Sequence, residues 1–352
     1  MDLTIPNCIY YNDLSDQAHV PSEDWAIFIE VKTDLKPFQT HIQQIRILRG
    51  RGLTIKNGSY AMRTLENEGY YNVINGYKDL FLVLNANGSY ATPEQYIPGA
   101  TFEEIYKLYI LDRELRNILL KYLLIFEKSV KSKISYRFSQ KFKLANAYLD
   151  MKNFTNNTNQ LKQVLKLITT LSNVITNHSD RNGPIKHYLD SHQEIPLWVL
   201  SNNLTLGNIQ NFYMCLDDPL KDQIAQDFSK IYKKTYTVNL QLPKDSLIDV
   251  LKTANLFRNV CAHEERLYSF NLNRPARSRH NSNLLNIPNH YLSGNLFTMV
   301  AYLKLVIAKK EHKFLISSLS QLFNKFQHDF TSINFNQILN QMGFPPNWKS
   351  LF

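Results

Sequence analysis

The residues best suited to chemistry lie in one polar segment, NLFRNVCAHEERL at residues 255–267. An imidazole such as that of His263 can exchange a proton near neutral pH, because the ordinary pKa of histidine is about 6.5. A guanidinium such as that of Arg258 can hold a phosphate through two hydrogen bonds and stabilise the charge that develops on it. This pair predicts phosphodiester chemistry, with His263 as the acid and base and Arg258 as the phosphate clamp. RNA brings its own nucleophile, the 2′-hydroxyl group, and DNA does not, so a catalytic site of this kind favours RNA as the substrate.

These residues are predicted to lie on one long helix over Lys244–Leu267. At about 100° per residue, one arc of that helix is apolar and forms its core side: Leu247, Val250, Leu251, Ala254, Phe257 and Cys261. A second arc, within about 80°, is polar and is the candidate site: Asn255, Asn259, His263 and Arg266. We expect Asn259 to orient the imidazole or contact the substrate, and Asn255 and Arg266 to bind RNA.

Arg258 lies about 140° away from His263 on the same helix. Either its long side chain reaches across, or it acts on a group that is shared with a second subunit. Two other interpretations of the polar arc stay open. The arc can be a structural network that joins two helices, or it can bind RNA without cutting it.

Basic residues outnumber acidic ones, with 40 Lys and Arg against 30 Asp and Glu and a formal net charge of +10. This excess indicates an anionic partner such as RNA, although a solvated basic surface has the same composition. One basic cluster spans residues 113–143, on a segment predicted to be helical. The second cluster holds Arg274, Arg277 and Arg279, in a proline-containing stretch through His280 that we expect not to form a regular helix. We predict that this second cluster contacts RNA phosphates near the site. The alternative is a solvated connector, which would leave the helix over 113–143 as the main phosphate contact.

The composition is that of a folded globular protein, with 44% hydrophobic and 12% aromatic residues and only 11 glycines. Three widely spaced cysteines, Cys8, Cys215 and Cys261, argue against a disulfide framework or a cysteine zinc site and favour the cytoplasm. The start of the chain lacks a secretory signal, and the most apolar stretch, residues 296–308, is shorter than the roughly 20 residues of a membrane span. No nucleotide-binding loop, GxSxG, HExxH or CxxC motif is present, so we expect neither a cofactor nor a metal.

Hydrophobic periodicity predicts a mainly α fold. Thr101 and Glu104 form a capping-box pattern that starts a long helix with a broad apolar face. Further helices are predicted over 40–50, from Ser59 to Gly69, over 161–175, from Pro196, over 296–326 with a break, and over 335–342; one short strand is predicted at 26–31. The turn-rich stretch 85–99 divides a small, mostly helical N-terminal domain (1–99) from a helical domain with C-terminal helices (100–352).

The segment RNVCAHEERLYS, in which Arg258 and His263 are separated by four residues, resembles the motif of HEPN ribonuclease domains. More of the chain is similar to abortive-infection (Abi) proteins of the AbiD/AbiF type, which are bacterial antiphage proteins. The similar blocks are Lys36-Pro37 with Arg51-Gly52-Leu53 and Tyr70-Tyr71, then Asp112-Arg113-Glu114-Leu115-Arg116, Ile195-Pro196-Leu197-Trp198, and MGFPPNW at 342–348. The resemblance spans nearly residues 36–352. The sequence departs from the family pattern at Glu264, Tyr268 and Leu206.

This resemblance implies a HEPN-type helical bundle that dimerises, so that two Arg–His motifs face one composite, metal-independent ribonuclease site. The product would carry a 2′,3′-cyclic phosphate. It also implies a toxin-like effector that an RNA or protein partner restrains until infection. A non-catalytic RNA-binding or sensing module of a defence system is the alternative.

Overall fold

The computed structural model describes residues 37–273 and 279–352, with only the backbone of Arg279. Residues Thr40–Phe352 form one compact unit. Its described part is built from helices and isolated β-bridges, without an extended strand, so the predicted mainly α fold is confirmed. The strand predicted at 26–31 lies outside the described residues, and the division into two domains at residue 99 stays a prediction.

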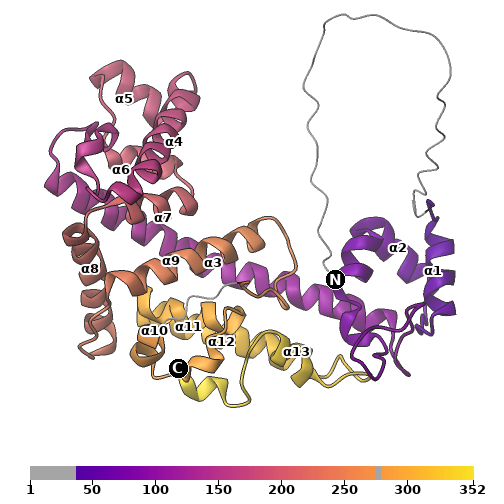
Figure 1. Cartoon of the computed structure of the whole chain (residues 1–352). Helices are drawn as coiled ribbons and strands as arrows, with labels where there is room; N and C mark the ends of the chain where they lie inside the picture. Colours follow the sequence, from indigo (N-terminus) through magenta and orange to yellow (C-terminus); the bar gives the residue numbers. More distant parts are fainter. Residues whose placement is uncertain (1–36, 274–278) are drawn as a thin grey trace, which may run out of the picture. The chain divides into compact units, whose positions relative to one another are not determined.

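Figure 1 shows the order of the α-helices along the described chain. They are α1 (His41–Gly50), α2 (Gly58–Glu68), α3 (Phe102–Lys141), α4 (Leu161–Ser179), α5 (Pro184–His192), α6 (Leu197–Leu200), α7 (Leu206–Cys215), α8 (Asp218–Tyr236), α9 (Lys244–Ala262), α10 (Arg279–Leu285), α11 (Leu296–Val306), α12 (Lys309–Phe326) and α13 (Phe335–Gln341).

The 40-residue helix α3 is the axis of the bundle. Its N-terminus carries the predicted capping box, because Thr101 Oγ1 accepts a hydrogen bond from the N–H of Glu104 (3.1 Å) and Glu104 Oε2 accepts one from the N–H of Thr101 (3.1 Å). α3 packs against α6, α7, α8, α9, α11 and α12. Contacts on several sides explain why its apolar face is broad.

The region before α3 holds α1, α2 and a π-helical turn, η1 (Tyr71–Asn75), which contacts α3. The predicted start of α2 at Ser59 is wrong. Asn57 caps this helix, with its side-chain oxygen accepting from the N–H of Tyr60 (2.9 Å), and Ser59 lies inside the first turn. Asparagine and serine are both strong caps, so their type alone does not decide between two neighbouring positions.

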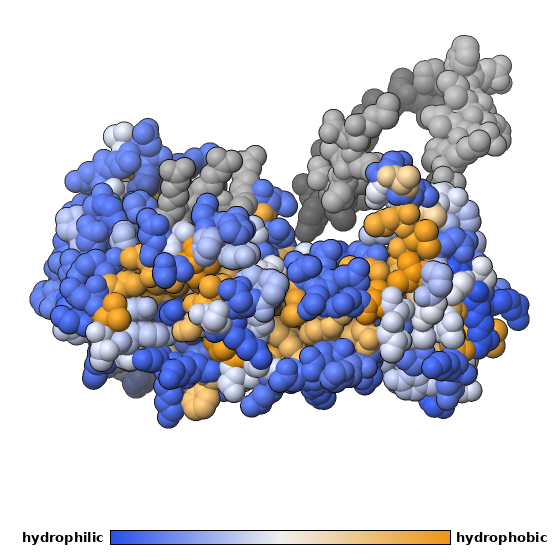
Figure 2. Space-filling model, turned by 90° about the horizontal axis from the view of Figure 1, so that it is seen from below, coloured by the Kyte–Doolittle hydropathy of each residue, from blue (hydrophilic) through white to orange (hydrophobic). Residues whose placement is uncertain are grey.

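The C-terminal helices follow the sequence pattern closely. The predicted break between residues 296 and 326 falls between α11 and α12, where Ile307 has an extended backbone. α11 is buried on all sides and packs on α8 and α9. No helix among the described residues is long and apolar enough to cross a membrane. Figure 2 shows a face on which hydrophobic side chains are interspersed with hydrophilic ones.

Candidate functional site

Helix α9 ends at Ala262, so its predicted continuation to Leu267 is wrong. His263 is the C-cap residue, and Glu264 has a left-handed backbone with φ of 56°. The N–H of Glu265 donates to the carbonyl of Val260 (3.0 Å), which closes the helix in a Schellman arrangement. This position usually holds glycine, so a glutamate there does not indicate the end of a helix.

The early end of α9 changes the candidate polar arc. Asn255 and Asn259 are helical, His263 is at the helix end, and Arg266 lies beyond it. The predicted apolar arc is confirmed, because all its members are buried: Leu247, Val250, Leu251, Ala254, Phe257 and Cys261. Burial raises the pKa of the Cys261 thiol to about 12, so this side chain behaves as a small hydrophobic group.

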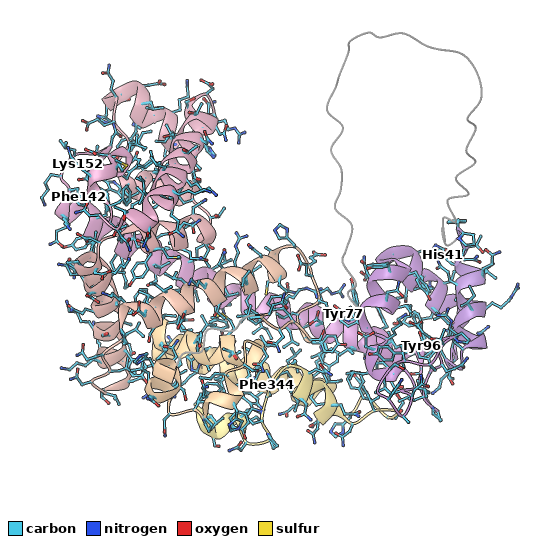
Figure 3. All side chains as sticks on the ribbon, in the orientation of Figure 1. His41, Tyr77, Tyr96, Phe142, Lys152 and Phe344 are labelled. Atoms are coloured by element: carbon cyan, nitrogen blue, oxygen red, sulfur yellow. The ribbon has the colours of Figure 1, made fainter. Side chains whose placement is uncertain are left out.

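A buried carboxylate on α3 fixes the segment that follows His263. Asp112 is fully buried and accepts hydrogen bonds from the backbone N–H groups of Leu267 (3.0 Å) and Tyr268 (2.6 Å). It also accepts from Tyr77 Oη (2.7 Å) and from Arg116 Nη1 (2.6 Å). Figure 3 labels Tyr77 beside α3. These four bonds tie α3, the loop before it and the end of α9 together, and we call this group the Asp112 latch.

The role of Asp112 was not predicted from the sequence. Asp112 stands within the apolar row of a predicted helix, and a carboxylate buried there needs hydrogen-bond partners. This pattern could have indicated a buried polar contact at Asp112. Its partners Leu267 and Tyr268 are more than 150 positions further along the chain, so periodicity could not identify them.

His263 lies at a cavity of about 430 Å³ between the end of α9 and η1. The lining residues are Tyr71, Asn72, Gly76, Tyr77, Tyr109, Arg116, His263, Glu264, Glu265 and Arg266. The His263 and Tyr71 side chains are exposed to solvent there. Burial, together with the Glu68 carboxylate, raises the pKa of Tyr109 to about 12, so this phenol stays neutral in the cavity wall.

The two arginines of this cavity both have carboxylate partners. Arg116 pairs with Asp112 within the latch. Arg266 Nη1 donates to Asp79 Oδ2 (2.9 Å) and to the carbonyl of Gly76 (2.8 Å). Arg266 therefore joins the end of α9 to the loop that follows η1, and its predicted contact with RNA stays a prediction.

Arg258 does not line the His263 cavity and instead contacts a carboxylate on α3. Its Nε is 3.6 Å from Glu127 Oε2 on α3, and Glu127 Oε1 accepts from Lys131 Nζ (2.7 Å). Along α3, Glu127 is eleven residues from Arg116, which is about 16 Å at 1.5 Å per residue. The structure thus does not bring Arg258 and His263 of one chain together at the His263 cavity.

The two asparagines have different surroundings. Asn255 is half-buried against α7, where a Cβ atom on Gly207 would lie 3.3 Å from Asn255 Oδ1. This close approach fits the structural interpretation for Asn255, since it packs between two helices. Asn259 is exposed one turn before His263.

The predicted arginine cluster is largely outside the described residues. Arg274 and Arg277 are not described, and Arg279 is described only as the first residue of α10. The expectation that the stretch through His280 avoids regular helix is wrong for its last two residues, because α10 begins at Arg279.

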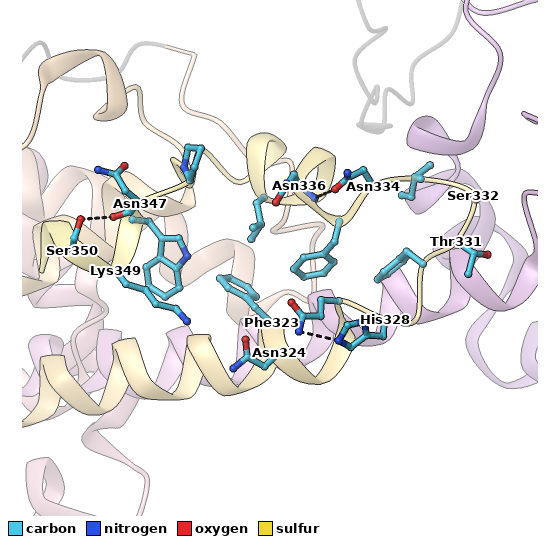
Figure 4. Close-up of a pocket in the computed structure, with 17 residues that line it drawn as sticks. Phe323, Asn324, His328, Thr331, Ser332, Asn334, Asn336, Asn347, Lys349 and Ser350 are labelled. Carbon is cyan, nitrogen blue, oxygen red and sulfur yellow. Dashed lines mark hydrogen bonds between the residues drawn. The ribbon is translucent and has the colours of Figure 1, made fainter.

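A cavity of about 910 Å³ lies near the C-terminus, between the end of α12, α13 and the residues around Trp348 (Figure 4). Thr331 and Ser332 of its wall donate their backbone N–H groups to the buried Glu104 on α3 (2.6 Å and 2.7 Å). None of the predicted site residues lines this cavity.

A family model described as Abi-like protein matches residues 63–269. The match covers more than half of the chain, which therefore belongs to the Abi-like protein family. This membership supports a role in abortive infection, the defence of a bacterial cell against phage. The matched region includes Asp112, Arg258 and His263 and ends directly after Tyr268. Searches of curated proteins and of solved structures found no match.

Proposed function

We propose that this Abi-like protein is a HEPN-type endoribonuclease that acts in antiphage defence and cleaves RNA without a metal ion. The observation that carries the proposal is the exposed imidazole of His263 at the rim of the 430 Å³ cavity. The Asp112 latch begins four residues later and fixes the backbone next to this imidazole. A mobile acid–base group is a poor catalyst, and the latch supplies the required positioning.

The reaction follows from the chemistry of RNA. His263 accepts the proton of a ribose 2′-hydroxyl group, whose oxygen attacks the adjacent phosphorus atom. The bond from phosphorus to the 5′-oxygen breaks, and that oxygen takes a proton from the His263 imidazolium as it leaves, which returns the imidazole to its neutral form. The products are a 2′,3′-cyclic phosphate and a free 5′-hydroxyl group.

Arg258 acts in this proposal from a second copy of the chain. The support is the separation of Arg258 from the His263 cavity within one chain, which leaves the phosphate there without a free guanidinium. A homodimer that places Arg258 of one copy at the His263 of the other would supply it. Arg258 must then leave Glu127, so the Arg258–Glu127 pair is a candidate restraint on activity before infection.

The second candidate function is an RNA-binding or sensing module that does not cut. It is favoured by the pairing of Arg116 with Asp112 and of Arg266 with Asp79, because each guanidinium in the cavity is already neutralised.

Cleavage in the presence of EDTA separates the two candidates. The full chain, stripped of bound nucleic acid at high salt, is incubated with end-labelled RNA. The unmodified chain and a His187→Ala control are expected to cut, since His187 is an exposed histidine on α5 away from the cavity. His263→Ala is expected to lose at least 100-fold in rate, in line with the usual contribution of acid–base catalysis. Binding without cutting by the unmodified chain would support the sensing module instead.

A further inference from the structure

A third cavity, of about 640 Å³, lies where α6 and the following turn η6 (Ser201–Asn203) pack against α3. Figure 1 shows α6 near the C-terminal part of α3. The cavity wall combines aromatic rings, ammonium groups and buried polar groups: Tyr136, Trp198, Lys128, Lys131, Glu127 and Ser135. We call it the Trp198 cavity.

The two aromatic rings are unusually open to solvent. Trp198 is 55% exposed and Tyr136 is 62% exposed. The other three residues of α6 are buried, so this short helix is anchored firmly and presents only the indole outward. An exposed indole on a rigid support offers a face on which a planar, unpaired base can stack.

The charges around the cavity are mostly positive. Lys128 is exposed and has no ion-pair partner within the described chain. Lys131 and Arg258 both lie against the single carboxylate of Glu127. Three cations around one carboxylate leave a positive balance, which favours a ligand that carries phosphate.

Two buried polar atoms of the cavity wall lack hydrogen-bond partners among the described residues. They are Glu127 Oε2, whose ion-pair contact with Arg258 Nε at 3.6 Å is too long for a hydrogen bond, and Ser135 Oγ, on residues that are 7% and 2% exposed. A buried polar group without a partner costs free energy, so a ligand that supplies one is bound more tightly. A carboxylate only accepts hydrogen bonds, and the amino groups of adenine, cytosine and guanine are suitable donors.

We propose that the Trp198 cavity binds one unpaired base of single-stranded RNA, stacked on Trp198, with Glu127 and Ser135 at its amino edge and Lys128 at its phosphate. This inference rests on the proposed action on RNA and names a recognition subsite for it. The subsite adjoins Arg258 through Glu127. Duplex RNA is excluded, because its bases are stacked on each other.

Binding is measured by fluorescence anisotropy with labelled RNA 12-mers and the full-length His263→Ala chain, which leaves the RNA intact. Trp198→Ala is expected to weaken binding by about 5- to 100-fold, the usual range for loss of one stacked base. Trp198→Phe keeps a stacking ring and is expected to retain most of the affinity. Phe314→Ala removes another exposed aromatic ring, on α12, and is the matched control with unchanged affinity.

The sequence of the RNA tests the polar part of the cavity. Adenine and cytosine 12-mers are expected to bind more tightly than a uracil 12-mer, since uracil lacks an amino group, and Ser135→Ala is expected to reduce that difference. RNA is also expected to quench tryptophan fluorescence in the chain that retains Trp198 and not in the Trp198→Phe chain.

The outcomes distinguish this subsite from the nuclease proposal. Single-stranded RNA that binds Trp198→Ala as tightly as the parent chain, or does not bind at all, overturns the subsite. If the unmodified chain cuts RNA and Trp198→Ala cuts it equally well at low RNA concentration, the subsite is wrong and the nuclease stands. If binding depends on Trp198 and no condition gives cleavage, the subsite stands and the nuclease is wrong.

Discussion

Replacing Asp112 by asparagine tests whether the Asp112 latch holds the end of α9 in place. The substitution keeps the shape of the side chain and removes its charge. Arg116, whose side chain is 5% exposed, then lacks a counter-ion in a buried setting. Breaking a buried ion pair in this way costs about 3–5 kcal/mol of unfolding free energy.

The geometry of the Asp112 latch lowers the unfolding free energy of Asp112→Asn further. Three donors point at Asp112 Oδ2 and one, the N–H of Tyr268, points at Oδ1. The side-chain oxygen of asparagine can replace Oδ2. The NH2 group of the asparagine then takes the place of Oδ1 and faces the N–H of Tyr268, so two hydrogen-bond donors oppose each other and that bond is lost. Together the two effects predict that the unfolding free energy falls by about 3–5 kcal/mol and the melting temperature by about 4–7 °C.

Urea unfolding of the Asp112→Asn chain beside the unmodified chain measures this loss. Asp180→Asn, at an exposed aspartate after α4, is the control and is expected to change the unfolding free energy by less than about 0.5 kcal/mol. Adding Arg116→Met to Asp112→Asn is expected to recover part of the loss, because the unpaired charge is removed. A loss below about 1 kcal/mol for Asp112→Asn alone would refute the role given to the latch.

Three further substitutions test local features of the fold. Glu264→Gly relieves the left-handed backbone at φ 56° and is expected to leave the unfolding free energy unchanged or to raise it by up to about 1 kcal/mol. Glu264→Val is expected to lower the unfolding free energy, and equal values for the two variants would contradict the strain at this position. Burial lowers the pKa of His312 to about 4. Between pH 6.5 and pH 4 the unfolded chain therefore binds a proton that the folded chain does not, and the unfolding free energy falls by about 3 kcal/mol as the pH falls through this range. His312→Gln should flatten that part of a pH series of urea unfolding curves, and an unchanged slope would disprove the assignment. Gly343→Ala places a Cβ atom, at a position with φ of 80°, into the side-chain amide of Asn295, so the melting temperature is expected to fall. A melting temperature within about 2 °C of that of the unmodified chain would contradict the packing described.

Much of the fold could be predicted from the sequence because its signals are local. The capping box of Thr101 and Glu104 marked the start of α3, and the apolar arc of α9 marked its buried side. The end of α9 could not be predicted, because Glu264 adopts a conformation that its residue type does not indicate. The pairing of Arg258 with Glu127 spans 131 positions in the chain and depends on how α9 packs on α3.

The candidate site was therefore predicted in part. The exposed position of His263 follows from its place in the polar segment. Its separation from Arg258 was indicated by the angle of about 140° between them on a helix. The role of Asp112 and the partners of Arg266 required the tertiary structure, since their contacts come from segments far apart in the sequence.

The most direct test of a composite ribonuclease site mixes two inactive chains. His263→Ala retains Arg258, and Arg258→Ala retains His263, so a mixed dimer contains one complete pair across its interface. We predict that each variant alone fails to cut RNA in EDTA and that the mixture recovers activity, with 2′,3′-cyclic phosphate ends on the products. Full activity of either variant alone, or a mixture that stays inactive while the unmodified chain cuts, would contradict the composite site.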